Sequence, residues 1–211
     1  MRYAQIKRRE NPEGIYILSK GCSPFFIPKN LLIEFDYTYY FEQESIDEDQ
    51  YNQLKTINKI YLCRKKALDL LARREHTVLE LKFKLKKRKF SRNAIDHSIP
   101  YLLEKKYLSE ERFSQSFILS KNKKGEGKFL ILQRLQKKGI SSSKALEYYE
   151  EEIDFDMEIN ACIKSMMKLC TKKDLSNEEL FYKLKTKGFN YSIIKEAYQI
   201  YFDEKNKDTF F

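Results

Sequence analysis

The chain has 211 residues, and its 41 Lys and Arg against 31 Asp and Glu give a formal net charge of +10. With 34% charged and 42% apolar residues, it resembles neither a disordered chain nor a membrane-embedded one. No stretch approaches the roughly 18 consecutive apolar residues of a membrane helix, and no apolar segment follows the basic N-terminus as in a secretory signal. Only 6 Gly and 4 Pro are present, which favours helices. We therefore expect a soluble, cytoplasmic and mainly helical protein without membrane contact.

The first 50 residues have a pattern of their own. Residues 3–9 and 15–19 are candidate strands, and the turn sequence Asn11-Pro12-Glu13-Gly14 lies between them. The apolar segments within residues 25–33 are too short to assign to a helix or a strand. An acidic segment, residues 42–49, joins this part to the rest of the chain. We predict a small N-terminal extension that contains β structure, in the form of a hairpin.

The remainder of the chain contains an internal repeat of about 50 residues. Three segments align without gaps, and their final apolar residues, Phe90, Ile140 and Phe189, lie 50 and 49 residues apart. The apolar spacing within each repeat predicts three helices. The predicted fold class is therefore mainly α, with tandem three-helix units behind the β-containing extension. The predicted divisions are 1–50 for the extension and 51–106, 107–153 and 154–211 for the three repeats.

Local signals mark where several of these helices begin. Thr77 and Ser176 each open a capping-box sequence, with a glutamate three residues later. Ser91 and Ser109 are further N-cap candidates. Pro100 is an exception within the third helix of the first repeat, because proline cannot donate the helical hydrogen bond. We expect a kink or an early helix end at that residue.

The ends of the second helices are marked by glycine in two of the three repeats. Gly139 and Gly188 lie where a left-handed C′ residue would close the helix, and an apolar residue follows each of them. Lys89 replaces that glycine in the first repeat. The turn there must therefore differ or carry a small strain.

The residues that usually carry catalysis or bind metals are few and scattered. No two of the four cysteines form a C-x-x-C pair, and neither histidine lies at metal-ligand spacing from a cysteine. The residues concerned are Cys22, Cys63, Cys162, Cys170, His76 and His97. We therefore predict reduced cysteines, no metal site, no cofactor and no enzymatic activity.

One short motif, Gly125-Glu126-Gly127-Lys128-Phe129, resembles a phosphate-binding loop only superficially. It lacks the four-residue spacing between the glycines and the Ser or Thr after the lysine. We interpret it as a flexible interhelical loop. A backbone contact with phosphate and a hinge between repeats are the alternatives.

The excess positive charge lies in the middle of the chain. Residues 67–149 hold 20 Lys and Arg but 9 Asp and Glu, whereas the rest of the chain is close to neutral. A block this basic predicts a polyphosphate partner; a lysine-rich solvated face is the alternative, and cations near helix C-termini are also stabilised by the helix dipole. The candidate residues for binding DNA or another polyphosphate are Arg73, Arg74, Lys82, Lys86, Lys87, Arg88, Arg92, Lys121, Lys123, Lys124, Lys128, Arg134, Lys137 and Lys138.

A three-helix unit is also typical of helix-turn-helix proteins, so a sequence-specific transcription factor is a second hypothesis. Such a protein needs its third helix to present Arg, Asn or Gln to base edges. Only the third helix of the first repeat, with Arg92 and Asn93, offers such residues. The basic residues gather instead on second helices and loops, which suits contact with the DNA backbone. A protein-interaction scaffold whose charge only aids solvation is a third hypothesis.

Four ordered motifs within about residues 51–202 resemble the RecX family of recombination regulators. They are Ala67-Leu68-Asp69-Leu70-Leu71-Ala72-Arg73-Arg74-Glu75-His76-Thr77 with Glu80-Leu81 and Lys84-Leu85, Tyr107-Leu108-Ser109-Glu110-Glu111-Arg112-Phe113, Lys124-Gly125-Glu126-Gly127, and Lys138-Gly139-Ile140. The chain departs from the family pattern at Lys89, Pro100, Ser114 and Lys128. The first 50 residues lie outside the resemblance.

The resemblance implies tandem three-helix repeats in an elongated, curved molecule. It also implies a protein that binds RecA, lies along the groove of the RecA–DNA filament, and modulates strand exchange, ATP hydrolysis and coprotease activity, usually by inhibition. The basic residues of the repeats would then face single- or double-stranded DNA or the filament. We expect the regulator to be a monomer, because no repeat shows an apolar face left uncovered.

Overall fold

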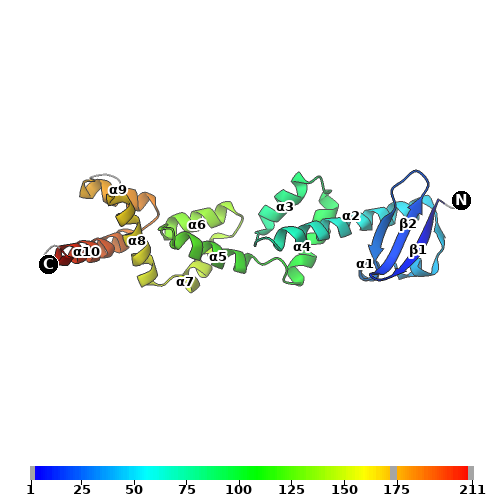
Figure 1. The fold of residues 1–211 in the computed structure, drawn as a ribbon, viewed down its shortest axis with the longest axis horizontal. Coiled ribbons are helices and arrows are strands. Elements are labelled where there is room, and N and C mark those ends of the chain that lie inside the picture. The colour runs from blue at the N-terminus through cyan, green and yellow to red at the C-terminus, as the bar shows by residue number, and fades with distance from the viewer. Residues whose placement is uncertain (1–2, 172–174, 209–211) are drawn as a thin grey trace. The chain divides into compact units, whose positions relative to one another are not determined.

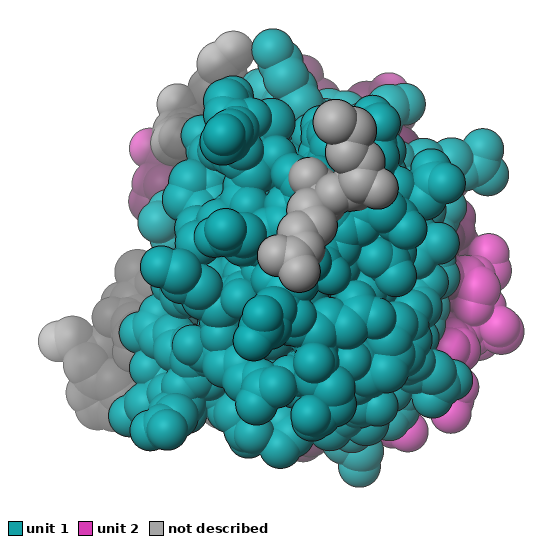
Figure 2. Space-filling model, turned by 90° about the vertical axis from the view of Figure 1, so that its right-hand side faces the viewer, with its two compact units in different colours: residues 1–74, 80–108 teal, residues 75–79, 109–211 magenta. Residues whose placement is uncertain are grey.

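A computed structural model describes residues 3–171 and 175–208 of the chain (Figure 1). The chain forms two compact units, the first made of residues 1–74 with 80–108 and the second of residues 75–79 with 109–211 (Figure 2). The described part of the chain holds ten α-helices, and its β-strands lie before the second of these helices. The predicted fold class, a mainly helical chain with a small N-terminal β extension, is therefore confirmed. The divisions at residues 50, 106 and 153 stay a prediction.

The N-terminal extension is a four-stranded antiparallel sheet with the order β3-β2-β1-β4. Strands β1 (Ala4–Glu10) and β2 (Glu13–Ser19) form the predicted hairpin. Strand β3 (Phe25–Pro28) comes from the apolar segments that were too short to assign, and β4 (Ser45–Ile46) pairs with β1. Between β3 and β4 the chain forms helix α1 (Lys29–Glu34) and a 3-10 helix (Thr38–Glu42).

Helix α2 (Glu48–Leu71) joins the sheet to the helical part of the first unit. It begins with a capping box in which the Asp47 side chain accepts from the Gln50 N–H. Leu54 and Ile57 of α2 belong to the same buried cluster as the inward-facing isoleucines of β2 and β3. The extension and the start of α2 therefore share one hydrophobic core, because alternate strand residues and one helix face are both apolar.

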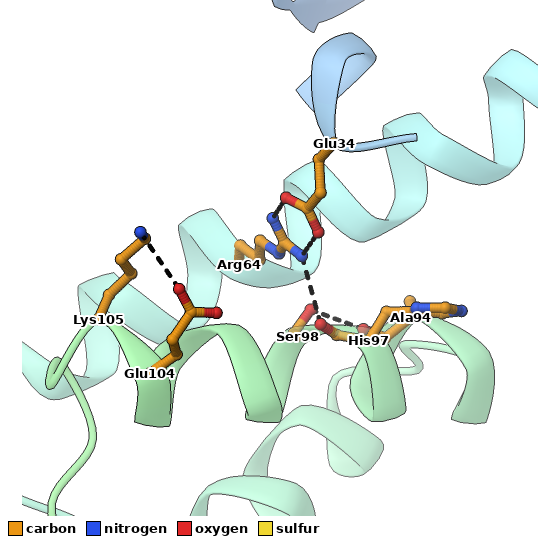
Figure 3. A network of polar contacts seen from close by, with 7 residues as sticks. All are labelled: Glu34, Arg64, Ala94, His97, Ser98, Glu104 and Lys105. Carbon is orange, nitrogen blue, oxygen red and sulfur yellow. Dashed lines mark hydrogen bonds and ion pairs between the residues drawn. The ribbon is translucent and has the colours of Figure 1, made fainter. Parts of the chain in front are cut away.

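A buried arginine fixes the extension to the first repeat (Figure 3). Arg64 of α2 donates from both terminal nitrogens to the two Glu34 oxygens at 2.6 Å each, and one of these nitrogens also reaches the His97 carbonyl at 3.3 Å. The guanidinium lies 3.9 Å from the centre of the Tyr101 ring. The hydrogen bond from Arg64 holds the pKa of Glu34 below its usual value, against the opposing effect of burial. Three elements, α1, α2 and α4, thus meet at one charged pair.

The first unit also contains α3 (Val78–Lys87) and α4 (Arg92–Glu104). Ser91 caps α4 as predicted, with its hydroxyl accepting from the Ala94 N–H at 3.3 Å. The expected early end at Pro100 is wrong, because α4 continues through this residue to Glu104. Pro100 lies on the exposed side of the helix, so the lost hydrogen bond is not accompanied by a clash in the core.

The second unit contains the remaining helices. They are α5 (Glu110–Asn122), α6 (Lys128–Lys137), α7 (Ser142–Glu152), α8 (Phe155–Cys170), α9 (Asn177–Thr186) and α10 (Tyr191–Asp208). Ser109 caps α5 and Ser176 forms the predicted capping box with Glu179. Gly139 and Gly188 have φ angles of +91° and +93°, as the predicted left-handed C′ positions require.

Candidate nucleic-acid interface

The glycine loop before α6 is fixed to the third repeat. The Gly125 carbonyl accepts from the Ser165 hydroxyl at 2.6 Å, and the Gly127 N–H donates to the Lys187 carbonyl at 2.9 Å. A Cβ on Gly127 would lie 2.5 Å from the carbonyl carbon of Gly188. The interpretation as a flexible loop is therefore wrong, because its backbone is held against α8 and the end of α9.

The first backbone amides of α6 are also used inside the protein. The Phe129 N–H donates to the Gly188 carbonyl at 3.0 Å, and the Lys128 N–H donates to the Glu158 carboxylate at 3.4 Å. Burial raises the pKa of Glu158, while its hydrogen bond from the Lys128 amide opposes that effect. These amides already have partners, so the structure gives no support to the alternative of a phosphate bound by this backbone.

Three of the candidate cations around this loop have carboxylate partners. Glu126, whose side chain is 16% exposed, lies 2.9 Å from Arg134 and 3.6 Å from Lys121. Lys128 pairs with Glu150 of α7 at 3.0 Å. The three cations share two carboxylates, so much of their charge is offset within the second unit.

Three further candidates in the first unit are also paired. Arg74 lies 3.0 Å from Glu80, while Arg92 and Lys82 both approach Asp96, at 3.4 Å and 4.0 Å. Together with the three cations around the loop, they make the set that we call the paired cations. The paired cations are Arg74, Lys82, Arg92, Lys121, Lys128 and Arg134.

Other candidates keep their side chains exposed and, within the described part of the chain, have no carboxylate partner. Lys86 and Lys87 lie in the last turn of α3, and Arg73 lies just after α2. Burial, followed by the positive charge of Arg74, lowers the pKa of Lys84 beside them.

The second unit contributes similar residues at the ends of α5 and α6. Lys123 and Lys124 follow α5, and Lys137 ends α6, all with exposed side chains. We use the name open cations for the exposed candidates that have no carboxylate partner among residues 3–171 and 175–208. The open cations are Arg73, Lys86, Lys87, Lys123, Lys124 and Lys137.

Two candidates belong to neither set. The Arg88 side chain donates to the Lys84 carbonyl at 3.0 Å, which helps to close α3. The Lys138 ammonium lies 5.5 Å and 5.6 Å from the ring centres of Phe113 and Phe117. Both residues therefore have structural roles of their own.

The sequence offered a signal for only some of these pairs. Arg92 and Asp96 are four residues apart on one helix, a spacing that predicts an ion pair. Glu126 lies within the loop motif itself, close to Lys121. Glu150, by contrast, lies 22 residues from Lys128 and meets it only because α7 folds back on α6.

The described residues contain no group of three His, Cys, Asp or Glu that could hold a metal ion. All four cysteines are free thiols. None of the helices that the structure describes is long and apolar enough to cross a membrane.

Known proteins share both sequence and fold with this chain. Residues 63–102 match the family model of the first three-helix domain of RecX. A regulatory protein RecX of Haemophilus influenzae is 33% identical over 129 residues, which cover 60% of this chain and 80% of that protein. The chain belongs to the RecX family. A regulatory protein RecX of Bacillus subtilis, 26% identical over 208 residues, extends the match to 96% of this chain and 77% of that protein.

Solved RecX structures share the fold. A crystal structure of a regulatory protein RecX aligns with a TM-score of 0.74 at 18% identity, and covers 93% of this chain and 100% of that one. RecX from Lactobacillus salivarius aligns with a TM-score of 0.59 at 22% identity, over 68% of this chain and 96% of that one. The region that matches the RecX family model contains α3, and so it contains the open cations Lys86 and Lys87.

Proposed function

We propose that this RecX-family chain regulates RecA by binding the RecA–DNA filament, and that it acts by binding rather than by catalysis. It inhibits the recombinase, ATPase and coprotease activities of RecA. Membership of a family of regulatory proteins carries the proposal. Its partners are RecA, RecA–DNA filaments and single- or double-stranded DNA, and it acts as a monomer.

The open cations support the DNA part of the proposal. They carry positive charge that no carboxylate of the described residues offsets, which is the condition for neutralising DNA phosphates. The paired cations would first have to break an ion pair. The open cations lie at or just after the ends of α2, α3, α5 and α6 rather than on the third helix of a repeat, which favours backbone contact over a transcription factor's base readout.

The deciding experiment measures ATP hydrolysis by the cognate RecA on single-stranded DNA while this protein is titrated in. Binding to the same DNA without RecA is measured in parallel, at equal salt. We expect hydrolysis to fall at concentrations that leave bare DNA largely unbound. If it falls only when the DNA itself is occupied, competition for DNA explains the effect and filament binding is wrong. If hydrolysis is unchanged while one duplex sequence binds far better than random DNA, the transcription-factor hypothesis replaces the proposal.

A further inference from the structure

Three exposed aromatic side chains surround one hollow of the second unit. Phe129 comes from the first turn of α6, Tyr182 from α9 and Tyr191 from the first turn of α10. They are 62%, 70% and 72% exposed. The hollow has a volume of about 550 Å³, and its other lining residues are Phe181, Lys185, Phe189, Asn190 and Ile194.

The backbone beneath two of these rings is held by hydrogen bonds. The Phe129 N–H is held by the Gly188 carbonyl at 3.0 Å, and the Asn190 side chain caps α10 by accepting from the Ile193 N–H at 2.8 Å. Tyr191 directly follows this cap. Phe129 and Tyr191 are therefore presented by hydrogen-bonded helix starts and Tyr182 by the middle of α9, yet most of the surface of the three rings stays in water, at a cost in hydration free energy. Such a cluster of exposed apolar surface marks a site of interaction.

The charge around the hollow indicates the kind of partner. Lys185 is the one charged residue that lines it, and no carboxylate does so among the described residues. Lys195, exposed on α10, lies one helical turn from Tyr191. Flat aromatic faces beside cations are what single-stranded nucleic acid requires, because each base offers a face for stacking and each phosphate a negative charge.

We propose that this hollow binds the unpaired bases of single-stranded DNA, with Tyr182 and Tyr191 as stacking faces and Lys185 as a phosphate contact. The proposal rests on the proposed function, because it assigns a site to the DNA strand that a filament regulator meets. It is distinct from the open cations, none of which lines the hollow. A segment of a partner protein is the competing occupant.

The test uses the full chain, without RecA, and a fluorescent thymidine oligonucleotide of about 20 bases. The double variant Y182A/Y191A should bind this strand at least roughly tenfold more weakly than the unmodified chain does. An oligonucleotide of equal length made of abasic sites should bind the unmodified chain about as weakly as the variant binds the thymidine strand. The matched control is F155A, since Phe155 is 57% exposed in the same unit but lies between Asp154 and Asp156.

Circular dichroism confirms that each variant is folded before binding is compared. Equal binding of the thymidine and abasic strands to the unmodified chain would overturn the proposal, because charge alone would then explain affinity. An unchanged affinity of Y182A/Y191A would overturn it as well. If that variant binds DNA normally but no longer lowers RecA's ATP hydrolysis, the hollow takes a protein segment instead. If the unmodified chain never alters that hydrolysis, the proposed function fails whatever the DNA result.

Discussion

Helices α3 and α6 occupy equivalent places in neighbouring repeats, yet their contacts and charges differ. Each has ten residues, buries two apolar residues four apart, and closes with the same left-handed turn. The start of α6 is built into the second unit, through backbone contacts to Lys187 and Gly188 and through the Lys128–Glu150 pair. The last turn of α3 carries the two open cations Lys86 and Lys87, whereas the last turn of α6 carries one, Lys137, beside the paired Arg134. The two helices share one local pattern, but the start of α6 is joined by its backbone to the end of α9, and the end of α3 carries more of the available positive charge.

The contact between the start of α6 and Gly188 is where we expect a single substitution to have the largest effect on stability. In Gly188→Ala, the new Cβ would lie 2.4 Å from the Leu130 backbone nitrogen, at a φ of +93° that alanine adopts only with strain. We expect a loss of roughly 2–5 kcal/mol in the free energy of unfolding, from overpacking and backbone strain together. Urea unfolding followed by circular dichroism measures it.

Gly21→Ala separates the two contributions. Gly21 also has a positive φ, of +77°, but a Cβ there meets nothing within 4 Å. This variant should lose only about 1 kcal/mol. If the two variants are equally destabilised, the close approach of α6 to Gly188 is not what the glycine serves.

Neutralising the open cations should have the next largest effect, on the salt dependence of DNA binding. In R73Q/K86Q/K87Q, three open cations are neutralised without cutting any ion pair within the described residues. We expect the log–log salt dependence of binding to single-stranded DNA to fall by about 2 in slope, since each neutralised phosphate contributes about 0.7. Fluorescence anisotropy over a salt series measures this slope.

The matched variant K121Q/K128Q/R134Q removes three paired cations from around the glycine loop. It should change the salt slope by less than about 1, because these charges already face Glu126 and Glu150. It should destabilise the second unit instead, since Glu126 is left largely buried without its counterions. Equal losses of slope in the two triple variants would contradict the distinction between open and paired cations.

The two units should also respond oppositely to acid. The pKa of Glu34 is lowered by Arg64, so its stabilising contribution is present above the ordinary value of 4.5 and is lost as pH falls through the lowered one. The pKa of Glu158 is raised by burial, so its contribution is present below 4.5 and is lost as pH rises through the raised one. We therefore expect Glu34→Gln to cost about 1–3 kcal/mol near pH 7 and less in acid.

Glu158→Gln provides the opposite control. Glutamine imitates the neutral carboxyl group, so this substitution should cost least near pH 7 and most below pH 4.5. Urea unfolding of both variants and the unmodified chain between about pH 3.5 and pH 7 tests the sign of each effect. A parallel pH dependence of the two variants would show that the carboxylates do not differ in this way.

The helices follow from the sequence more directly than the available charges do. The caps at Ser91, Ser109 and Ser176 were predictable because a cap is decided within three residues. Pairing is decided by tertiary structure: Glu34 lies 30 residues from Arg64. The aromatic hollow was missed for the same reason, since three separate helices supply its rings.

Substituting Lys89 should have the smallest effect, and it tests directly how the closing turn of α3 differs from the glycine turns of the other repeats. It closes α3 at a φ of +64°, where Gly139 and Gly188 close the equivalent helices, and its hydrogen bonds follow the same pattern. Its exposed side chain explains why a residue other than glycine fits here, but the backbone strain remains. Lys89→Gly should therefore stabilise the protein by up to about 1 kcal/mol, partly offset by the larger entropy of glycine in the unfolded chain. A loss of stability in urea unfolding would mean that the lysine, rather than the turn, holds the end of α3.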